Sequence, residues 1–142
     1  KNACKKVDTD KILIMNGDSL LKEKSIIELS RNSTDEHELM ICNFIKKNTR
    51  YGSVKIEDAT KLVTEFQPRP EANMKLSRAM INAGIYFCTK KSFLNYGKEV
   101  FSLEEDYLIN MAKRKRLMAV KRNSEFIDIG IPKDFEKAQT YI

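Results

Sequence analysis

The amino-acid sequence predicts a mixed α/β fold, in which a mostly parallel sheet is flanked by helices. Short apolar runs such as Ile12–Met15 are typical of strands that are buried on both faces. Capping signals and helical periodicity mark the segments between several of these runs. Two short strands, Tyr51–Glu57 and Leu62–Phe66, flank the turn at Asp58–Lys61 and indicate an antiparallel excursion in the middle of the chain. Strands that alternate with helices in this way pack as layers around one core.

Turn-forming residues and prolines limit the elements in the first two thirds of the chain. Asn16-Gly17-Asp18 ends the first strand, and Gly97 ends a short helix. Pro68 and Pro70 end the strand before them, because proline cannot donate to a ladder. The expected elements are the end of a helix within residues 1–10, strand Ile12–Met15, helix Ser25–Arg31, strand Glu38–Ile45, strands Tyr51–Glu57 and Leu62–Phe66, strand Ala83–Cys88 and helix Thr89–Tyr96.

The last third begins with a capping box, Ser102-Leu103-Glu104-Glu105. The Ser102 hydroxyl is expected to accept from the Glu105 amide, while the Glu105 side chain returns to the Ser102 amide. Pro132 suits the first position of the last helix, where its missing N–H costs nothing. We expect a helix after Ser102 with Leu103, Tyr107, Leu108 and Met111 on one face, strands at Leu117–Val120 and Glu125–Ile129, and a last helix with Phe135, Ala138 and Ile142 as its buried stripe.

Length and composition indicate a single domain, residues 1–142, with an ordinary balance of 42% apolar and 32% charged residues. No apolar run approaches the ~20 residues that a membrane helix needs, and no secretory signal opens the sequence. Cys4, Cys42 and Cys88 have no metal-ligand spacing, so we interpret them as reduced thiols of a cytoplasmic protein.

The net charge of +6 is compatible with a nucleic-acid partner, an anionic small substrate or a solvated surface without a partner. The densest basic run, Lys113-Arg114-Lys115-Arg116, falls at an expected helix C-terminus, where the helix dipole favours cations. No aromatic residues interleave this run to stack bases. We therefore expect neither a nucleic-acid nor a membrane partner.

Two aspartates directly follow apolar strands and are candidate metal ligands. In open α/β sheets, ligands bind at the carboxyl ends of strands. At Asn16-Gly17-Asp18, Gly17 would let a substrate approach the backbone and Asp18 would place a carboxylate at that rim; a tight Asn-Gly hairpin turn is the alternative. Asp128, within Phe126–Pro132, repeats the arrangement, with an ordinary exposed aspartate as the alternative. Two such carboxylates could hold one Mg²⁺.

Weaker signals come from Arg50-Tyr51-Gly52 and Ile81-Asn82-Ala83-Gly84, each of which puts a glycine beside polar groups at a strand start. Turn chemistry explains both about equally well. His37 is flanked by acidic residues and is interpreted as a solvated loop histidine.

Taken in order, six segments of the chain resemble the sugar-1-phosphate nucleotidyltransferase family. No single segment is specific, but six in the right order between residues 12 and 132 are hard to obtain by chance. The branch that the chain most resembles contains the guanylyltransferases acting on manno-heptose 1-phosphate or mannose 1-phosphate. The matching segments are Ile12–Asp18, Arg50–Gly52, Phe66–Ala72, Ile81–Tyr86, Phe101–Glu104 and Phe126–Pro132.

The resemblance implies an incomplete Rossmann-like nucleotidyltransferase fold and an enzyme that joins a sugar 1-phosphate to a nucleoside triphosphate, releasing pyrophosphate. Asp18 and Asp128 resemble the family's catalytic, Mg²⁺-binding aspartates. The substrate-binding residues that it implies are Asn16, Gly17, Gly52, Arg69, Asn82 and Gly84, with the backbone of Gly52 contacting the sugar.

The chain departs from the family pattern in two places. Pro68 and Arg69 stand where the family normally has a Glu-Lys pair; arginine can still meet a phosphate as a planar fork, whereas proline cannot bind a sugar hydroxyl. The family's N-terminal glycine-rich loop, which cradles the nucleotide phosphates, is absent, so the chain corresponds to the C-terminal part of a catalytic domain. We expect the isolated chain to be inactive and able to form a homo-oligomer through an unpaired sheet edge. A non-catalytic regulatory or binding module on the same fold is the alternative.

Overall fold

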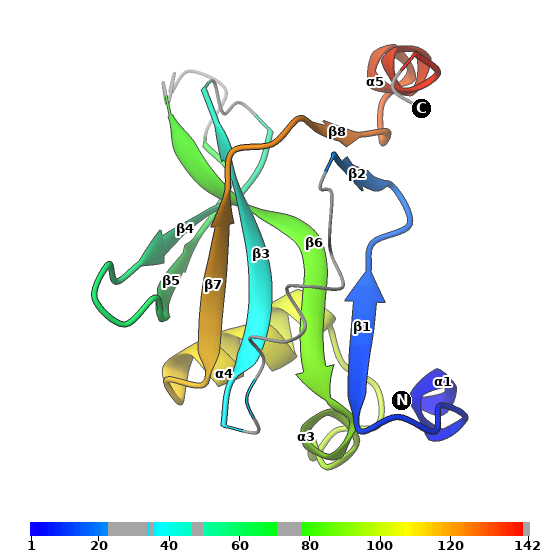
Figure 1. Cartoon of the computed structure of the whole chain (residues 1–142), viewed down its shortest axis with the longest axis vertical. Coiled ribbons are helices and arrows are strands. Elements are labelled where there is room, and N and C mark those ends of the chain that lie inside the picture. Colours follow the sequence, from blue (N-terminus) through cyan, green and yellow to red (C-terminus); the bar gives the residue numbers. More distant parts are fainter. Residues whose placement is uncertain (23–33, 35, 47–49, 71–77, 141–142) are drawn as a thin grey trace.

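A long central strand, β6 (Ala79–Thr89), organises the sheet of this computed structural model (Figure 1), which describes residues 1–22, 34, 36–46, 50–70 and 78–140. The helix expected at Ser25–Arg31 lies outside these residues. In the sheet, the described strands follow the order β5-β4-β6-β3-β7, and β1 also pairs with β6. The elements are α1 Asn2–Lys5, β1 Lys11–Met15, β2 Ser19–Leu21, β3 Glu38–Ile45, β4 Ser53–Ile56, β5 Val63–Gln67, β6 Ala79–Thr89, α3 Lys90–Leu94, η1 Leu103–Leu108, α4 Ile109–Lys113, β7 Leu117–Arg122, β8 Phe126–Asp128 and α5 Pro132–Ala138.

The mixed α/β class is confirmed, but the described sheet is mostly antiparallel, so the expectation of a mostly parallel sheet is wrong. β6 runs antiparallel to β1, β3 and β4, and β4 runs antiparallel to β5. Among the described strand pairs only β3 and β7 are parallel. β1, β3 and β7 do run in one direction, but β6 lies between β1 and β3 and reverses both pairings. An apolar run indicates that a strand is buried. It does not indicate whether the neighbouring strands are parallel or antiparallel to it.

β1 is not buried on both faces as its apolar run predicts. Ile12 is 6% exposed and faces the core, whereas Leu13 and Met15 are each 46% exposed. Side chains alternate between the two faces of a strand, and Ile12 and Ile14 point to the larger core while Leu13 and Met15 point to the other face. Within the described part of the chain, β1 pairs on one side only, with β6.

β6 bends near its middle, and the bend lets one strand pair with two others along one edge. Gly84 has a φ of +73°, and the register of β6 against β3 shifts between Met40 and Cys42. Before the bend, Ile81 pairs with β4; after it, Ile85 to Thr89 pair with β1. The ends of β1 and β4 are thereby brought to the same part of the molecule.

Helices η1 and α4 lie behind the sheet in Figure 1, and α3 lies at its lower end. The larger core cluster fills the space between these helices and the sheet. Tyr86 and Met40 from the strands pack there with Tyr107 and Leu108 from η1, all fully buried. Phe93 makes edge-to-face contacts with Phe101 and Tyr107, with ring centroids 5.5 and 5.1 Å apart, and the Phe101 and Tyr107 rings lie tilted to each other at 6.1 Å.

The predicted capping box is half confirmed. The Ser102 hydroxyl accepts from the Glu105 amide at 3.1 Å, but the Ser102 amide donates to Asp106 Oδ2 at 2.9 Å rather than to Glu105. The cause is the wider first turn, a π-helical one in which the Tyr107 amide bonds the Ser102 carbonyl. The returning carboxylate therefore comes from one residue further along, and Glu105 is left to face elsewhere.

A small two-stranded sheet, β2 with β8, lies beside the end of β1, and α5 follows it (Figure 1). Pro132 occupies the start of α5 as predicted, and Ala138 is buried. Phe135 is 53% exposed, so its expected place in a buried stripe is wrong; Ala138 is the buried residue of this short helix. Ile142 lies outside the described residues.

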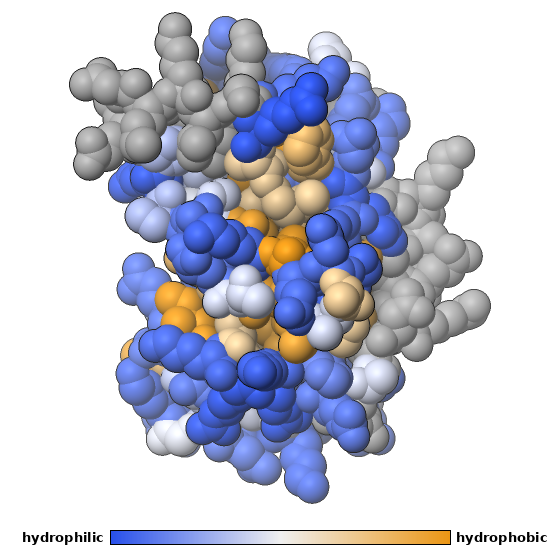
Figure 2. Space-filling view, turned by 90° about the vertical axis from the view of Figure 1, so that its left-hand side faces the viewer, coloured by the Kyte–Doolittle hydropathy of each residue, from blue (hydrophilic) through white to orange (hydrophobic). Residues whose placement is uncertain are grey.

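The opposite face of the sheet carries a second apolar cluster, built on Leu39, Ile41, Ile85 and Phe87. Figure 2 faces the side of the molecule formed by β4, β5 and β7, where apolar residues show only as a band between hydrophilic ones. No helix in the described part of the chain is long and apolar enough to cross a membrane.

Candidate functional site

A cavity of about 670 Å³ opens where β1 ends and β4 begins. It collects residues from parts of the chain that are far apart in sequence. The wall contains most of the residues singled out in the sequence, together with others that were not. The lining residues are Asn16, Asp18, Ser19, Arg50, Tyr51, Gly52, Ser53, Val54, Phe66, Gln67, Pro68, Arg69, Asn82, Glu104, Glu105, Ile109, Phe126 and Asp128.

The two candidate metal ligands, Asp18 and Asp128, lie on paired segments of the backbone. Ser19 in β2 is the antiparallel partner of Asp128 in β8, and the Ile129 amide donates to the Asp18 carbonyl at 2.9 Å. The Asn-Gly sequence therefore does not form a hairpin that returns along β1. The strand after it pairs with β8, some hundred residues further along the chain, and this pairing places both aspartates at one cavity.

Three neighbours orient the Asp128 carboxylate. Its Oδ1 accepts from the Gly130 amide at 2.8 Å, and its Oδ2 lies 3.3 Å from Arg50 Nη2. The hydroxyl of Tyr51 also hydrogen-bonds to it; burial, followed by the negative charge of Asp128, raises the pKa of Tyr51 to about 12. Arg50 in turn forms an ion pair with Asp134 in the first turn of α5.

The carboxylates of Asp18 and Asp128 suit a hard divalent cation. The Ser19 hydroxyl donates to Asp18 Oδ1 at 3.3 Å, and no lysine or arginine of the described residues forms an ion pair with Asp18. No cluster of three or more His, Cys, Asp or Glu side chains suited to a metal occurs in the described part of the chain. Mg²⁺ characteristically takes only one or two carboxylates and completes its shell with water and substrate phosphate. The donor set therefore fits Mg²⁺ and does not fit a metal that needs a full protein cage.

Asn82 belongs to a hydrogen-bonded cluster that also contains two residues missed by the sequence reasoning. Its amide donates to Tyr86 Oη at 2.7 Å and to Glu104 Oε1 at 3.0 Å, and the Tyr86 hydroxyl donates to the same Glu104 oxygen at 3.1 Å. The Asn82 oxygen accepts from the Gly84 amide at 3.0 Å. The sequence placed Glu104 in a capping box and in the matching segment Phe101–Glu104, but did not name it as a site residue.

The three candidate glycines have different surroundings. At Gly84, a Cβ would lie 2.8 Å from the side chain of Asn16, so the glycine makes room for a lining residue of the cavity. At Gly52, a Cβ would lie 2.8 Å from the Gln67 carbonyl, which shows a close approach of two chain segments at the wall. Around Gly17 no atom lies within 4 Å of such a Cβ, and Gly17 and Gly84 do not themselves line the cavity.

Pro68 and Arg69, the residues that depart from the family's Glu-Lys pair, both line the cavity. They follow β5, whose partner strand β4 starts next to Gly52. Arg69 thus brings a cation to the same cavity as the two aspartates.

Comparison with known proteins places these features in a family context. The family model described as "Nucleotidyl transferase" matches residues 1–142. The chain is 30% identical over 141 residues to D-glycero-alpha-D-manno-heptose 1-phosphate guanylyltransferase of Aneurinibacillus thermoaerophilus, covering 98% of this chain and 59% of that protein. It is 33% identical over 126 residues to the enzyme of the same name from Campylobacter jejuni, covering 86% of this chain and 52% of that protein.

Solved structures agree with the sequence matches. The crystal structure of HddC from Yersinia pseudotuberculosis superposes with a TM-score of 0.78 at 30% identity, over 99% of this chain and 60% of that one. The same protein complexed with GMP-PN gives a TM-score of 0.77. The chain thus spans between 52% and 60% of the length of these relatives.

Proposed function

The chain belongs to the nucleotidyl transferase family, and from that premise we propose that it forms the sugar-binding and metal-binding part of a sugar-1-phosphate nucleotidyltransferase. In the proposed reaction, a phosphate oxygen of the sugar 1-phosphate bonds to the α-phosphorus of a nucleoside triphosphate. The bond from that phosphorus to the bridging oxygen breaks, and pyrophosphate leaves. The observation that carries the proposal is the single cavity that holds Asp18, Asp128 and Arg69 together.

Asp18 and Asp128 are the residues that we propose hold Mg²⁺. A bound Mg²⁺ would supply positive charge where a phosphoryl group gains negative charge. The chain itself holds the Asp128 carboxylate in place through the Gly130 amide, Arg50 and Tyr51. Preorganisation of this kind lowers the cost of ordering the ligands when the site fills.

On the sugar side, Arg69 is proposed to bind the phosphate, and Glu104 and Asn82 to bind sugar hydroxyls. Asn82 and Tyr86 both donate to Glu104 Oε1, which fixes this carboxylate at the wall with acceptor capacity left for a hydroxyl donor. Glu104 could thereby replace the hydroxyl acceptor that Pro68 does not provide. Gly52 lines the same cavity, and its backbone is proposed to contact the sugar.

A non-catalytic binding or regulatory module is the second candidate, and Pro68 in the cavity wall favours it. The inactivity of the isolated chain stays a prediction, which a pyrophosphate-release assay measures. A cytoplasmic location also remains part of the proposal; the three cysteines, none of which forms a disulfide, support it.

Calorimetric titration with mannose 1-phosphate in MgCl₂ tests the sugar side. Arg69→Ala should weaken binding at least about tenfold, since a charge-assisted hydrogen bond contributes ~1.5–3 kcal/mol and each tenfold corresponds to about 1.4 kcal/mol. Arg78→Ala is the matched control, because Arg78 is exposed and does not line the cavity. Equal dissociation constants for the two variants would place the sugar phosphate away from Arg69.

A further inference from the structure

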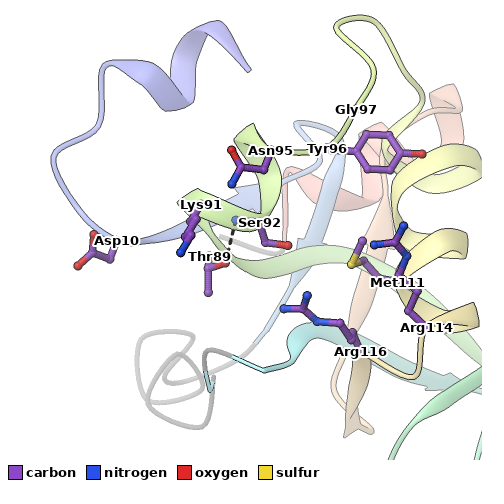
Figure 3. Close-up of a pocket in the computed structure, with 10 residues that line it drawn as sticks. All are labelled: Asp10, Thr89, Lys91, Ser92, Asn95, Tyr96, Gly97, Met111, Arg114 and Arg116. Carbon is purple, nitrogen blue, oxygen red and sulfur yellow. Dashed lines mark hydrogen bonds between the residues drawn. The ribbon is translucent and has the colours of Figure 1, made fainter.

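A second cavity, of about 640 Å³, lies at the opposite end of β1 from the candidate active site. Asp10, which precedes β1, lines this cavity, whereas Asn16, which follows β1, lines the first. Its volume is within the ~300–1,000 Å³ typical of small-molecule sites. Figure 3 shows its walls: α3 and the strand end before it on one side, and the residues around the end of α4 on the other. The lining residues are Asp10, Thr89, Lys91, Ser92, Asn95, Tyr96, Gly97, Met111, Arg114 and Arg116.

The charge of this second cavity is positive. Three cationic side chains line it against one carboxylate, and the Asp10 carboxylate points away from the cavity in Figure 3. Lys91 and Arg114 form no ion pair with any of the described residues. Arg116 Nε donates to the Glu36 carbonyl at 2.9 Å, which fixes the direction of its guanidinium. A concave wall of one sign attracts ligands of the other.

The basic run Lys113–Arg116 divides between this cavity and its surroundings. Lys113 is in the last turn of α4, where the helix dipole explains its charge. Lys115 has a φ of +56° and turns the chain, so Arg114 and Arg116 both line the cavity while Lys113 and Lys115 do not. The helix-end explanation still covers Arg114, the C-cap residue of α4, but it does not account for Arg116, which lies beyond the helix end.

The remaining wall combines polar and apolar groups. The Tyr107 hydroxyl donates its one hydrogen to the buried Glu38 carboxylate at 3.1 Å. The Ser92 hydroxyl lies 3.1 Å from the Tyr107 oxygen and therefore donates to that oxygen. Asn95 adds an amide with two N–H groups, and Tyr96 and Met111 add apolar surface. Cations and an amide suit a phosphate group, and the apolar wall leaves room for an organic part of the same ligand.

We propose that this cavity is a second anion site, which binds a phosphate-bearing small molecule through Lys91, Arg114 and Arg116. It is separate from the cavity that holds Asp18 and Asp128. The proposal stands independently of the function proposed above.

The test is calorimetric titration of the chain with inorganic pyrophosphate, at low ionic strength and with EDTA to exclude metal complexes. The double variant R114Q/R116Q should bind at least tenfold more weakly than the wild type. K113Q/K115Q is the matched control, since it removes the same charge from the same run and should stay within about twofold. Lys91→Gln, on the other wall of the cavity, should weaken pyrophosphate binding about threefold. This variant keeps the proposal testable if R114Q/R116Q does not fold.

Arg69→Gln separates the two cavities: it removes the cation of the first cavity, and the pyrophosphate binding that depends on Arg114 and Arg116 should remain. Binding that is lost in Arg69→Gln but kept in R114Q/R116Q would assign the anion to the first cavity and overturn the proposal. Equal binding by R114Q/R116Q and K113Q/K115Q, or absence of binding in the wild type, would overturn it as well.

Discussion

Arg50 joins parts of the candidate site that are far apart in the sequence. Its guanidinium pairs with Asp128 at the end of β8 and with Asp134 in α5, and it lies 5.2 Å from the ring centroid of Tyr51. Tyr51 itself packs edge-to-face on Phe126, with centroids 5.7 Å apart. The direction of the Asp128 carboxylate is therefore set by side chains that no local pattern connects to it.

The cysteines give a prediction at the scale of single residues. Burial raises the pKa of the Cys42 thiol to about 12, with Lys121 opposing the rise, and burial also raises the pKa of Cys88. Because the thiolate is the nucleophile, both should resist iodoacetamide at pH 8, while the half-buried Cys4 reacts. Mass spectrometry should find one adduct per folded chain and three in urea. Rapid modification of Cys42 in the folded chain would contradict its burial.

The same shift has a consequence for stability. Between pH 9 and about 12, the Cys42 thiol, whose pKa is raised from 9.0 to about 12, keeps its proton in the folded chain but loses it in the unfolded one. The contribution of this thiol to the free energy of unfolding is therefore complete below pH 9 and is lost as the pH rises towards 12.

Among the elements, β6 does most to position the site. Its bend at Gly84 places Asn82 at the cavity, and the Asn16 amide donates to the Gly84 carbonyl at 2.8 Å. The sequence identified Gly84 as a candidate but attributed it to turn chemistry or to the sugar site. In the structure, its positive φ and its contact with Asn16 are features of a bent strand, which a single sequence does not distinguish from a turn.

Replacing Gly84 with alanine tests the importance of this bend. The new Cβ would meet both an unfavourable φ and the Asn16 side chain at 2.8 Å, so Gly84→Ala should lower the free energy of unfolding by about 1–3 kcal/mol. Gly97→Ala is the control, because no atom lies within 4 Å of its added Cβ and its φ is not positive. Urea denaturation measures both, and equal stability of the two variants would mean that the bend relaxes without cost.

At the scale of the whole molecule, sequence patterns predicted the elements better than their arrangement. β3 has the bounds that its apolar run predicts, and Ser102, Pro132 and the strand pair around Asp58–Lys61 occupy their expected positions. The prediction of parallel strands was wrong because β6 lies between β1 and β3 and is antiparallel to both. No local stretch of sequence indicates this order of strands. The pairing of β2 with β8, which unites the aspartates, is a long-range contact of the same kind.

Some residues of the candidate site could also be predicted from the sequence, and others could not. Asp18, Asp128, Arg69 and Asn82 could be named in advance because each belongs to a motif in a recognisable order. Arg50 and Glu104 also lie in matching segments, but sequence reasoning assigned them no role in the site, because their contacts with Asp128 and with Tyr86 form across the fold. The second cavity was hidden for a similar reason, since a basic run does not show which of its members face inward.

The central claim is that Asp18 and Asp128 hold one divalent cation together. Electron paramagnetic resonance with Mn²⁺ as a probe for Mg²⁺, in the presence of mannose 1-phosphate, measures this directly. The wild type should bind one Mn²⁺ per chain, and Asp18→Asn and Asp128→Asn should each weaken binding by at least about tenfold, because each removes a charged oxygen ligand. Asp8→Asn, at an exposed position away from the cavity, should leave the affinity unchanged. Unaltered Mn²⁺ binding in both the Asp18 and the Asp128 variant would contradict the proposed metal site.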